Sequence, residues 1–87
     1  MTHVILRTPA VRARNGGIGK STLHRRVAAG LHTPPVKLGA RASGYPEHEV
    51  DAILAARIAG KSDEEIRRLV AELIAARKTL SALPKAA

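Results

Sequence analysis

Apolar residues recur at helical spacing in two segments of the second half of the chain. The first segment begins at Pro46-Glu47, carries acidic residues near its positive end and stops before Gly60. One face of this predicted helix holds Val50, Ile53, Leu54 and Ile58. The second segment begins at Ser62-Asp63-Glu64-Glu65, which has the form of a capping box. Its apolar stripe consists of Ile66, Leu69, Val70, Leu73, Ile74 and Leu80.

The first half of the chain predicts two shorter helices joined by a glycine turn. A Thr-Pro pair favours a helix over residues 8–14, and Asn-Gly-Gly at 15–17 interrupts it and supplies positive φ for a tight turn. A second helix is expected over residues 20–29, with Gly30 as its left-handed C-terminal residue. Leu23 and Val27 share the inner face of this helix. Two short helices joined by such a turn are typical of a helix-turn-helix.

The segment between the two halves predicts a rigid connector and a hairpin. Consecutive prolines in residues 31–35 exclude a helix there. Residues 36–45 alternate apolar and polar positions around a Gly-Ala-Arg turn, which is the layout of a wing with Arg41 at its tip. We therefore predict a mainly α protein with a small β-hairpin, a winged helix-turn-helix over residues 1–60. An extra C-terminal helix in residues 61–87 either completes the core or mediates oligomerisation, and we expect residues 83–87 to be frayed.

Gly19-Lys20-Ser21 suggests a different interpretation, the phosphate loop of a nucleotide-binding enzyme. That loop requires a glycine five residues before its Gly-Lys pair, and this position is Arg14. The loop also follows a buried strand of a parallel sheet with helices on both faces, for which 87 residues are too few. Nucleotide binding is therefore the remote alternative, and the Gly-Lys-Ser is better explained as the first turn of a helix.

Composition excludes several other functions. The chain has no cysteine, its four histidines lack ligand spacing, and its acidic residues lie in helical, solvated-looking patterns. We therefore expect no metal, no cofactor and no catalysis. No apolar run has the length of a membrane span, and the N-terminus lacks a signal-peptide core. These features together favour a cytoplasmic protein without a membrane partner.

The distribution of charge predicts the partner. The chain carries a net charge of +8, and residues 1–46 hold eight basic residues and no acidic one, whereas residues 47–87 hold seven of each. Such an imbalance favours a polyanion. The single aromatic residue, Tyr45, leaves no platform for stacking on unpaired bases, so double-stranded DNA is the expected ligand. An acidic protein is the alternative partner for the basic half.

Residues 19–59, "GKSTLHRRVAAGLHTPPVKLGARASGYPEHEVDAILAARIA", resemble the AlpA family of small winged helix-turn-helix regulators and excisionases, which have the MerR-like excisionase fold. The matching blocks are S-T-L-H-R, P-x-V-K-L-G and G-Y-P-E-x-E-V-D-A, in the family's order and at its spacing. Tyr45 and Ile53 replace two tryptophans that are usual in the family, and Arg26 replaces an apolar residue and is expected at the rim of the core. These are changes in packing that leave the DNA face intact.

The helix over residues 20–29 and the wing supply the predicted DNA contacts. The recognition helix offers Lys20, Ser21, Thr22, His24 and Arg25 to the major groove. The wing offers Lys37 and Arg41, and further contacts to the DNA backbone are expected from Arg7, Arg12, Arg14 and Arg26. The six apolar residues of the C-terminal stripe are the candidates for oligomerisation.

The resemblance implies a sequence-specific DNA-binding protein of a mobile element. It would act as an excisionase, which directs an integrase towards excision, as a transcriptional regulator, or as both, and regulation of prophage genes alone is the alternative. The resemblance also implies head-to-tail self-association along the DNA.

Overall fold

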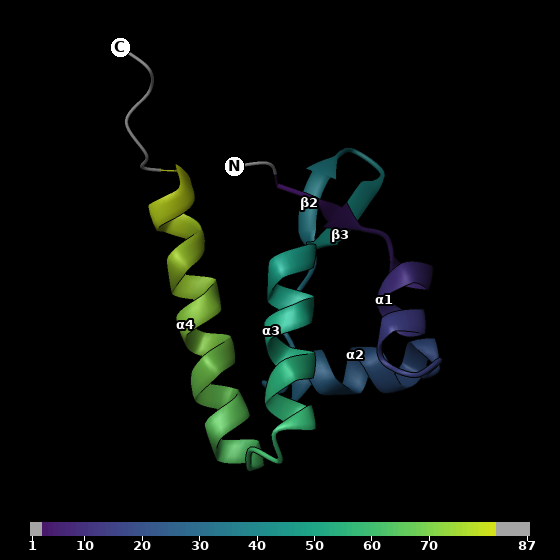
Figure 1. Ribbon diagram of the computed structural model, residues 1–87. Coiled ribbons are helices and arrows are strands. Elements are labelled where there is room, and N and C mark those ends of the chain that lie inside the picture. Colours follow the sequence, from purple (N-terminus) through teal and green to yellow (C-terminus); the bar gives the residue numbers. More distant parts are fainter. Residues whose placement is uncertain (1–2, 82–87) are drawn as a thin grey trace.

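The computed structural model describes residues 3–81. Within this range the chain forms four helices and a three-stranded antiparallel sheet (Figure 1). In chain order these are β1 (Ile5–Leu6), α1 (Thr8–Arg14), α2 (Lys20–Ala28), β2 (Val36–Gly39), β3 (Ala42–Pro46), α3 (Glu47–Ile58) and α4 (Asp63–Ser81). The expectation of a mainly helical protein with a small hairpin is confirmed. The tail at 83–87 lies outside the described residues.

The hairpin of β2 and β3 is part of a larger sheet than the sequence predicted. β3 lies in the middle, with β1 and β2 on either side of it, both antiparallel to it. Leu6 of β1 pairs with Tyr45, and the register of β2 shifts between Lys37 and Gly39. β1 was not expected, because two residues are too few to show an alternating pattern.

Glycines produce the turn between α1 and α2, as predicted. Gly16 and Gly17 have φ values of 82° and 79°, a region that residues with a Cβ rarely adopt. The Gly17 N–H donates to the carbonyl of Arg12 at 2.8 Å, which closes the end of α1. The chain can then reverse within a few residues and begin α2 at Lys20, after Gly19 at the N-cap.

One cluster of buried side chains joins the sheet to the first three helices. It consists of Leu6, Val11, Leu23, Tyr45 and Val50, with Ile18 and Val27 packed against it. Leu23 is fully buried, so α2 is anchored through the inner face that the sequence predicted. Tyr45 is also buried and meets the ring of His32 edge-on, with the ring centroids 5.5 Å apart.

A second cluster joins α3 to α4, which lie side by side and run in opposite directions (Figure 1). It consists of Ile53, Ile66 and Val70, with Leu31, Ala56, Leu69 and Leu73 packed against it. Part of the predicted stripe of α4 therefore completes the core within one chain. Ile74 and Leu80 of that stripe stay exposed at 39% and 38%.

The capping box predicted at the start of α4 is confirmed. The Glu65 N–H donates to Ser62 Oγ at 3.2 Å, and the Ser62 N–H donates to Glu65 Oε1 at 3.2 Å. The apolar face predicted for α3 is not buried along its whole length, since Val50 and Ile53 are buried but the side chain of Ile58 is 79% exposed. Ile58 lies in the last turn of α3, where the chain already turns towards α4.

Candidate nucleic-acid interface

The outer face of α2 presents the side chains that the sequence predicted for DNA contact. Lys20, Ser21, His24 and Arg25 are exposed, and Thr22 is half-buried. The Arg25 Nη2 group donates to Thr22 Oγ1 at 3.4 Å, a long contact that leaves most of its donors available. Ala28 also lies exposed at the end of α2. Its small side chain would allow the helix to approach a groove closely.

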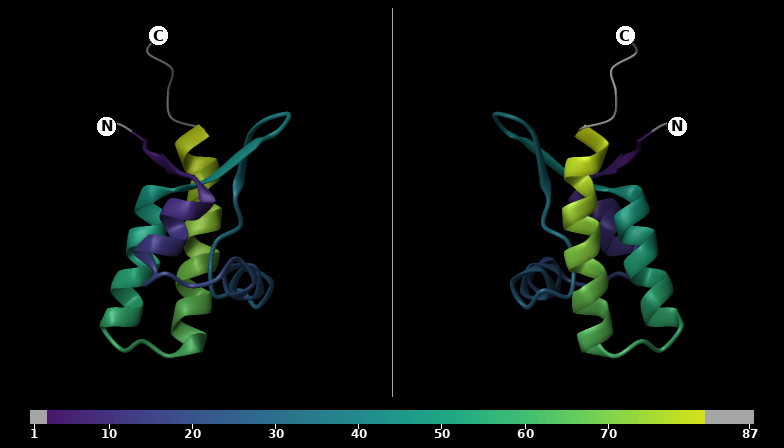
Figure 2. Two further views of the ribbon diagram at one scale, coloured as in Figure 1. Left: turned by 90° about the vertical axis from the view of Figure 1, so that its right-hand side faces the viewer. Right: turned by 90° about the vertical axis from the view of Figure 1, so that its left-hand side faces the viewer.

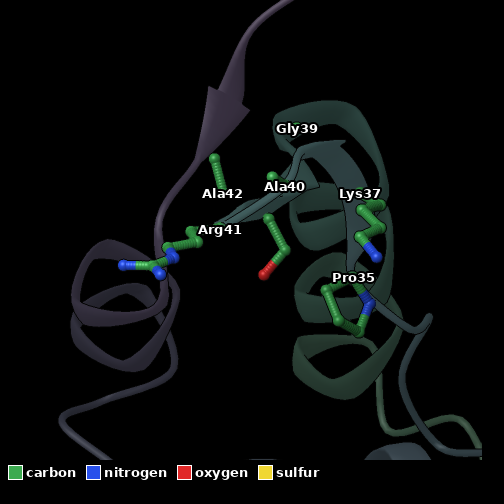
Figure 3. A pocket seen from close by; sticks show the side chains of 7 residues that line it. Pro35, Lys37, Gly39, Ala40, Arg41 and Ala42 are labelled. Atoms are coloured by element: carbon green, nitrogen blue, oxygen red, sulfur yellow. The ribbon is translucent and has the colours of Figure 1, made fainter.

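The β2–β3 hairpin carries the second predicted group. Lys37 lies on β2 and Arg41 in the tip between the strands, and both side chains are exposed. An open hollow of about 380 Å³ lies beside them, lined by Pro35, Lys37, Gly39, Ala40, Arg41, Ala42 and Ser43 (Figure 3). Lys37 and Arg41 flank Ala40 on opposite sides. Within residues 3–81 neither cation has a hydrogen-bond or ion-pair partner.

The two groups lie on the same side of the molecule. In both views of Figure 2 the tip of the hairpin and α2 project away from α3 and α4 on a common side. The structure therefore brings α2, which carries Arg25, and the hairpin tip, which carries Arg41, to one side of the molecule, although these residues are 16 positions apart in the sequence. The surface formed by α2 and the hairpin is built from the part of the chain that has no acidic residue.

Two of the arginines expected at the DNA backbone are bonded to other residues of the chain. Arg14 forms ion pairs with Glu47 at 2.8 Å and Asp51 at 3.0 Å, which raise the pKa of its guanidinium. Arg12 Nε donates to the carbonyl of Ile18 at 2.9 Å, across the turn between α1 and α2. These side chains link α1 to its neighbours. Arg7 is exposed and makes no such bond among the described residues.

Arg26 is half-buried, as the resemblance to the AlpA family led us to expect, and it has a neighbour that the sequence did not indicate. Burial and the positive charge of Arg57 both lower the pKa of Arg26. The Nε and Nη2 groups of Arg57 are buried and have no hydrogen-bond partner among the described residues. Arg57 thus extends the positive charge of α2 onto the end of α3. No motif in the sequence connects these two residues, which are 31 positions apart.

The expectation that all acidic residues are solvated is wrong for Glu49. Its side chain is fully buried, and both of its oxygens accept hydrogen bonds from Arg77, at 2.8 and 2.6 Å. The same Arg77 donates to the carbonyl of Pro34 at 2.7 Å. The pair links residues in different helices, so helical periodicity within either one could not reveal it.

His32 is a second buried polar residue in this region. Its side chain is 1% exposed, and its Nδ1 lies 2.9 Å from the carbonyl of Thr33. Burial lowers the pKa of the imidazole, and the charges of Arg26 and Arg57 lower it further. Its Nε2 has no hydrogen-bond partner in the described part of the chain. His32 is therefore a neutral core residue at neutral pH and does not face the surface formed by α2 and the hairpin.

Between residues 3 and 81 no helix combines the length and the apolar composition needed to cross a membrane. The same residues contain no group of three or more histidine, aspartate or glutamate side chains that could hold a metal ion.

Comparison of the chain with protein-family models, curated proteins and solved structures found no match.

Proposed function

We propose that the chain is a winged helix-turn-helix protein that binds double-stranded DNA at specific sequences. One observation carries this proposal: α2 and the tip of the β2–β3 hairpin lie on one side of the molecule (Figure 2), and both carry exposed basic side chains. An α-helix fits the major groove of B-DNA, and a hairpin beside it can reach the adjacent minor groove or its phosphates.

Each predicted contact then has a chemical role. Arg25 and His24 can donate hydrogen bonds to base edges, and Ser21 can donate or accept them. Lys20 and the backbone N–H groups at the start of α2 are suited to a phosphate. Arg41 at the hairpin tip suits the minor groove, where the negative potential is strongest in narrow A·T-rich segments.

The biological role follows from the resemblance of residues 19–59 to the AlpA family. We propose an excisionase of a mobile element, a regulator of its transcription, or a protein with both activities. An excisionase needs no catalytic group of its own, because it arranges DNA and recruits an integrase, which is a possible partner here. Head-to-tail association along DNA would then rest on exposed apolar residues such as Ile74 and Leu80, since Ile66 and Val70 are buried within the chain.

Selection of duplexes from a random pool, followed by gel-shift titration at several salt concentrations, tests the proposal. We expect enrichment of a defined sequence and a linear decrease of log K with log salt, with a slope near −0.9 for each phosphate contacted. Binding without any sequence preference would contradict specific recognition. Hydrolysis or tight binding of ATP would instead support the nucleotide-binding alternative, and binding of acidic proteins but not DNA the interaction-module alternative.

The role of the hairpin has its own test. Arg41→Ala should weaken DNA binding and reduce the magnitude of the salt slope by about 1 if the side chain contacts a phosphate. Arg68→Ala, which removes the same charge from an exposed position of α4, is the matched control and should leave the slope unchanged. If Arg41→Ala and Arg68→Ala bind DNA with the same affinity and the same salt slope, the hairpin is not part of the interface.

A further inference from the structure

Helix α4 contacts both ends of the connector that joins α2 to the hairpin. Arg67 Nε donates to the carbonyl of Ala29, the residue that follows α2, at 2.9 Å. Ten residues further along α4, Arg77 Nη2 donates to the carbonyl of Pro34 at 2.7 Å, two residues before β2 begins. Residues 29–34 therefore form a connector, and α4 holds it at each end.

The two anchors lie well apart on α4, because ten residues of α-helix span about 15 Å. The connector runs in the same direction as α4 (Figure 2). A connector that is hydrogen-bonded to one helix at both ends has less freedom to shift against that helix.

The contact at Pro34 is partly buried, whereas the contact at Ala29 is exposed. Both oxygens of the fully buried Glu49 accept hydrogen bonds from Arg77, which fixes the orientation of its guanidinium. At the other end, the stem of Arg67 lies beside Gly30, whose φ of 76° ends the α2 segment. A side chain at Gly30 would be strained, and its Cβ would lie 3.7 Å from Arg67 Cγ.

The middle of the connector is packed as well. Leu31 packs against the cluster formed by α3 and α4, and His32 and Thr33 are buried. Pro34 is followed by Pro35, so the backbone there is stiff. The connector is thus part of the core and does not act as a free linker between α2 and the hairpin.

We infer that α4 sets the spacing and orientation of α2 relative to the β2–β3 hairpin, with Arg67 and Arg77 as positioning residues for DNA recognition. The inference rests on the proposed function, because it assigns the spacing to the reading of adjacent grooves. An α2 that shifts against the hairpin cannot place both elements on one DNA site. Specific binding should then suffer more than non-specific binding, which depends on charge.

The absence of cysteine from the chain permits a direct measurement on the free protein. Spin labels attached through Ser21→Cys and Ala40→Cys, both exposed positions, report the distance between α2 and the hairpin by pulsed electron resonance. Arg67→Ala combined with Arg77→Lys should broaden this distance distribution. Arg68→Ala, an exposed neighbour on α4, should leave it unchanged. An unchanged distribution in a folded Arg67→Ala/Arg77→Lys protein would overturn the inference.

A second variant tests the inference if Arg67→Ala/Arg77→Lys does not fold. Glu49→Met/Arg77→Met with Arg67→Ala removes both anchors without leaving a buried carboxylate unpaired, and circular dichroism would test whether this variant is folded. It should broaden the distribution in the same way. If this folded variant keeps the wild-type distribution, the anchors do not set the spacing.

DNA binding provides the second readout, measured on the unlabelled full chain. Arg67→Ala should weaken binding to the selected site by about tenfold, the equivalent of one lost base contact. Its non-specific binding should match that of Arg68→Ala, which has the same net charge. Equal losses of specific affinity in the two variants would overturn the positioning role. A wild-type protein that binds no DNA would instead contradict the proposed function, while the distance measurement would still decide the role of α4.

Discussion

At the scale of single residues, two sets of arginines differ in whether they bind other parts of the chain. Arg12, Arg14, Arg67 and Arg77 donate to carbonyls or carboxylates and connect elements of the fold. Arg25 and Arg41 are exposed on the surface formed by α2 and the hairpin. Net charge alone does not separate these groups. Mutations of Arg25 and Arg41 should therefore affect DNA binding without affecting folding.

Arg25→Ala should remove a base contact from the centre of the proposed interface. We expect a loss of about 1–3 kcal/mol in binding to the selected site, with relaxed preference at one base position. Its thermal stability should be close to that of the wild type, because Arg25 is exposed and makes one long contact. Gel-shift titration against the selected duplex and single-base variants of it measures the effect.

Lys61→Ala is a control for this experiment, since it removes one positive charge from the turn between α3 and α4. If the two variants bind the selected site equally well, Arg25 does not read a base. A uniform loss over all duplexes in Arg25→Ala would reassign the residue to a phosphate contact.

The buried His32 predicts a dependence of stability on pH. Burial lowers its pKa in the folded state below the ordinary value of 6.5, so the unfolded chain takes up a proton first as the pH falls. Stability is therefore fully present above pH 6.5 and decreases as the pH falls towards the folded-state pKa. Thermal unfolding of the wild type between pH 7.5 and pH 5 should show a falling Tm.

His32→Phe supplies the control for the pH experiment. It keeps a ring against Tyr45 and removes the titrating group, so its Tm should vary less over the same range. The low-pH loss of Glu65 hydrogen bonds to Ser62 does not interfere, because those bonds lower the pKa of that carboxyl below its ordinary value of 4.5. A wild-type Tm that is constant from pH 7.5 to pH 5 would contradict the assignment.

At the scale of elements, the sheet depends on a close approach of β1 to β3. Gly44 lies on β3 where a Cβ would collide with the Ile5 side chain and lie 2.9 Å from the carbonyl oxygen of Leu6. The Leu6 backbone cannot move away without breaking its pairing with Tyr45. This glycine therefore provides space for β1, and its φ is not in the left-handed region.

Gly44→Ala should separate β1 from β3 and destabilise the protein by about 1–3 kcal/mol, as overpacking of a close contact does. Gly39→Ala is the matched control, because no atom lies within 4 Å of the position of its Cβ and its φ is also ordinary. Urea unfolding of both variants measures the difference. If Gly44→Ala and Gly39→Ala unfold at the same urea concentration, β1 does not require a glycine at position 44.

At the scale of the whole molecule, α4 belongs to the core that supports α2 and the hairpin. Ile66 and Val70 are buried against Ile53 of α3, and Arg77 neutralises the buried Glu49. A small chain has few other apolar residues to bury. The remaining exposed residues of the stripe are available for association, which stays a prediction.

Truncation after Gly60 should therefore unfold the protein. The shortened chain would expose Ile53 and leave Glu49 without Arg77, and loss of a buried partner costs about 3–5 kcal/mol, a large part of the stability of a small domain. Circular dichroism should show loss of helix beyond that contributed by α4 and no cooperative thermal transition. A truncated protein that stays folded and loses only cooperative binding to long DNA would make α4 an assembly element.

The helices, the glycine turns and the capping box follow from local sequence patterns. Glycines at 16, 17 and 30 and the Ser62–Glu65 reciprocal bonds act between residues at most a few positions apart, so the local pattern contains all the information. The exposed face of α2 was also predictable, because the periodicity that buries Leu23 turns Arg25 outward.

Contacts between residues that are distant in the sequence could not be predicted, because they depend on how the elements pack. β1 exists because it pairs with β3 some 40 positions away, and Glu49 is buried because Arg77 reaches it from α4, 28 positions further along. The same applies to the proximity of Arg26 to Arg57 and to the exposure of Ile58. Such contacts depend on how the helices pack, and the sequence of any one element is compatible with several packings. The spacing between α2 and the hairpin is decided at this level, because α4 holds both ends of the connector.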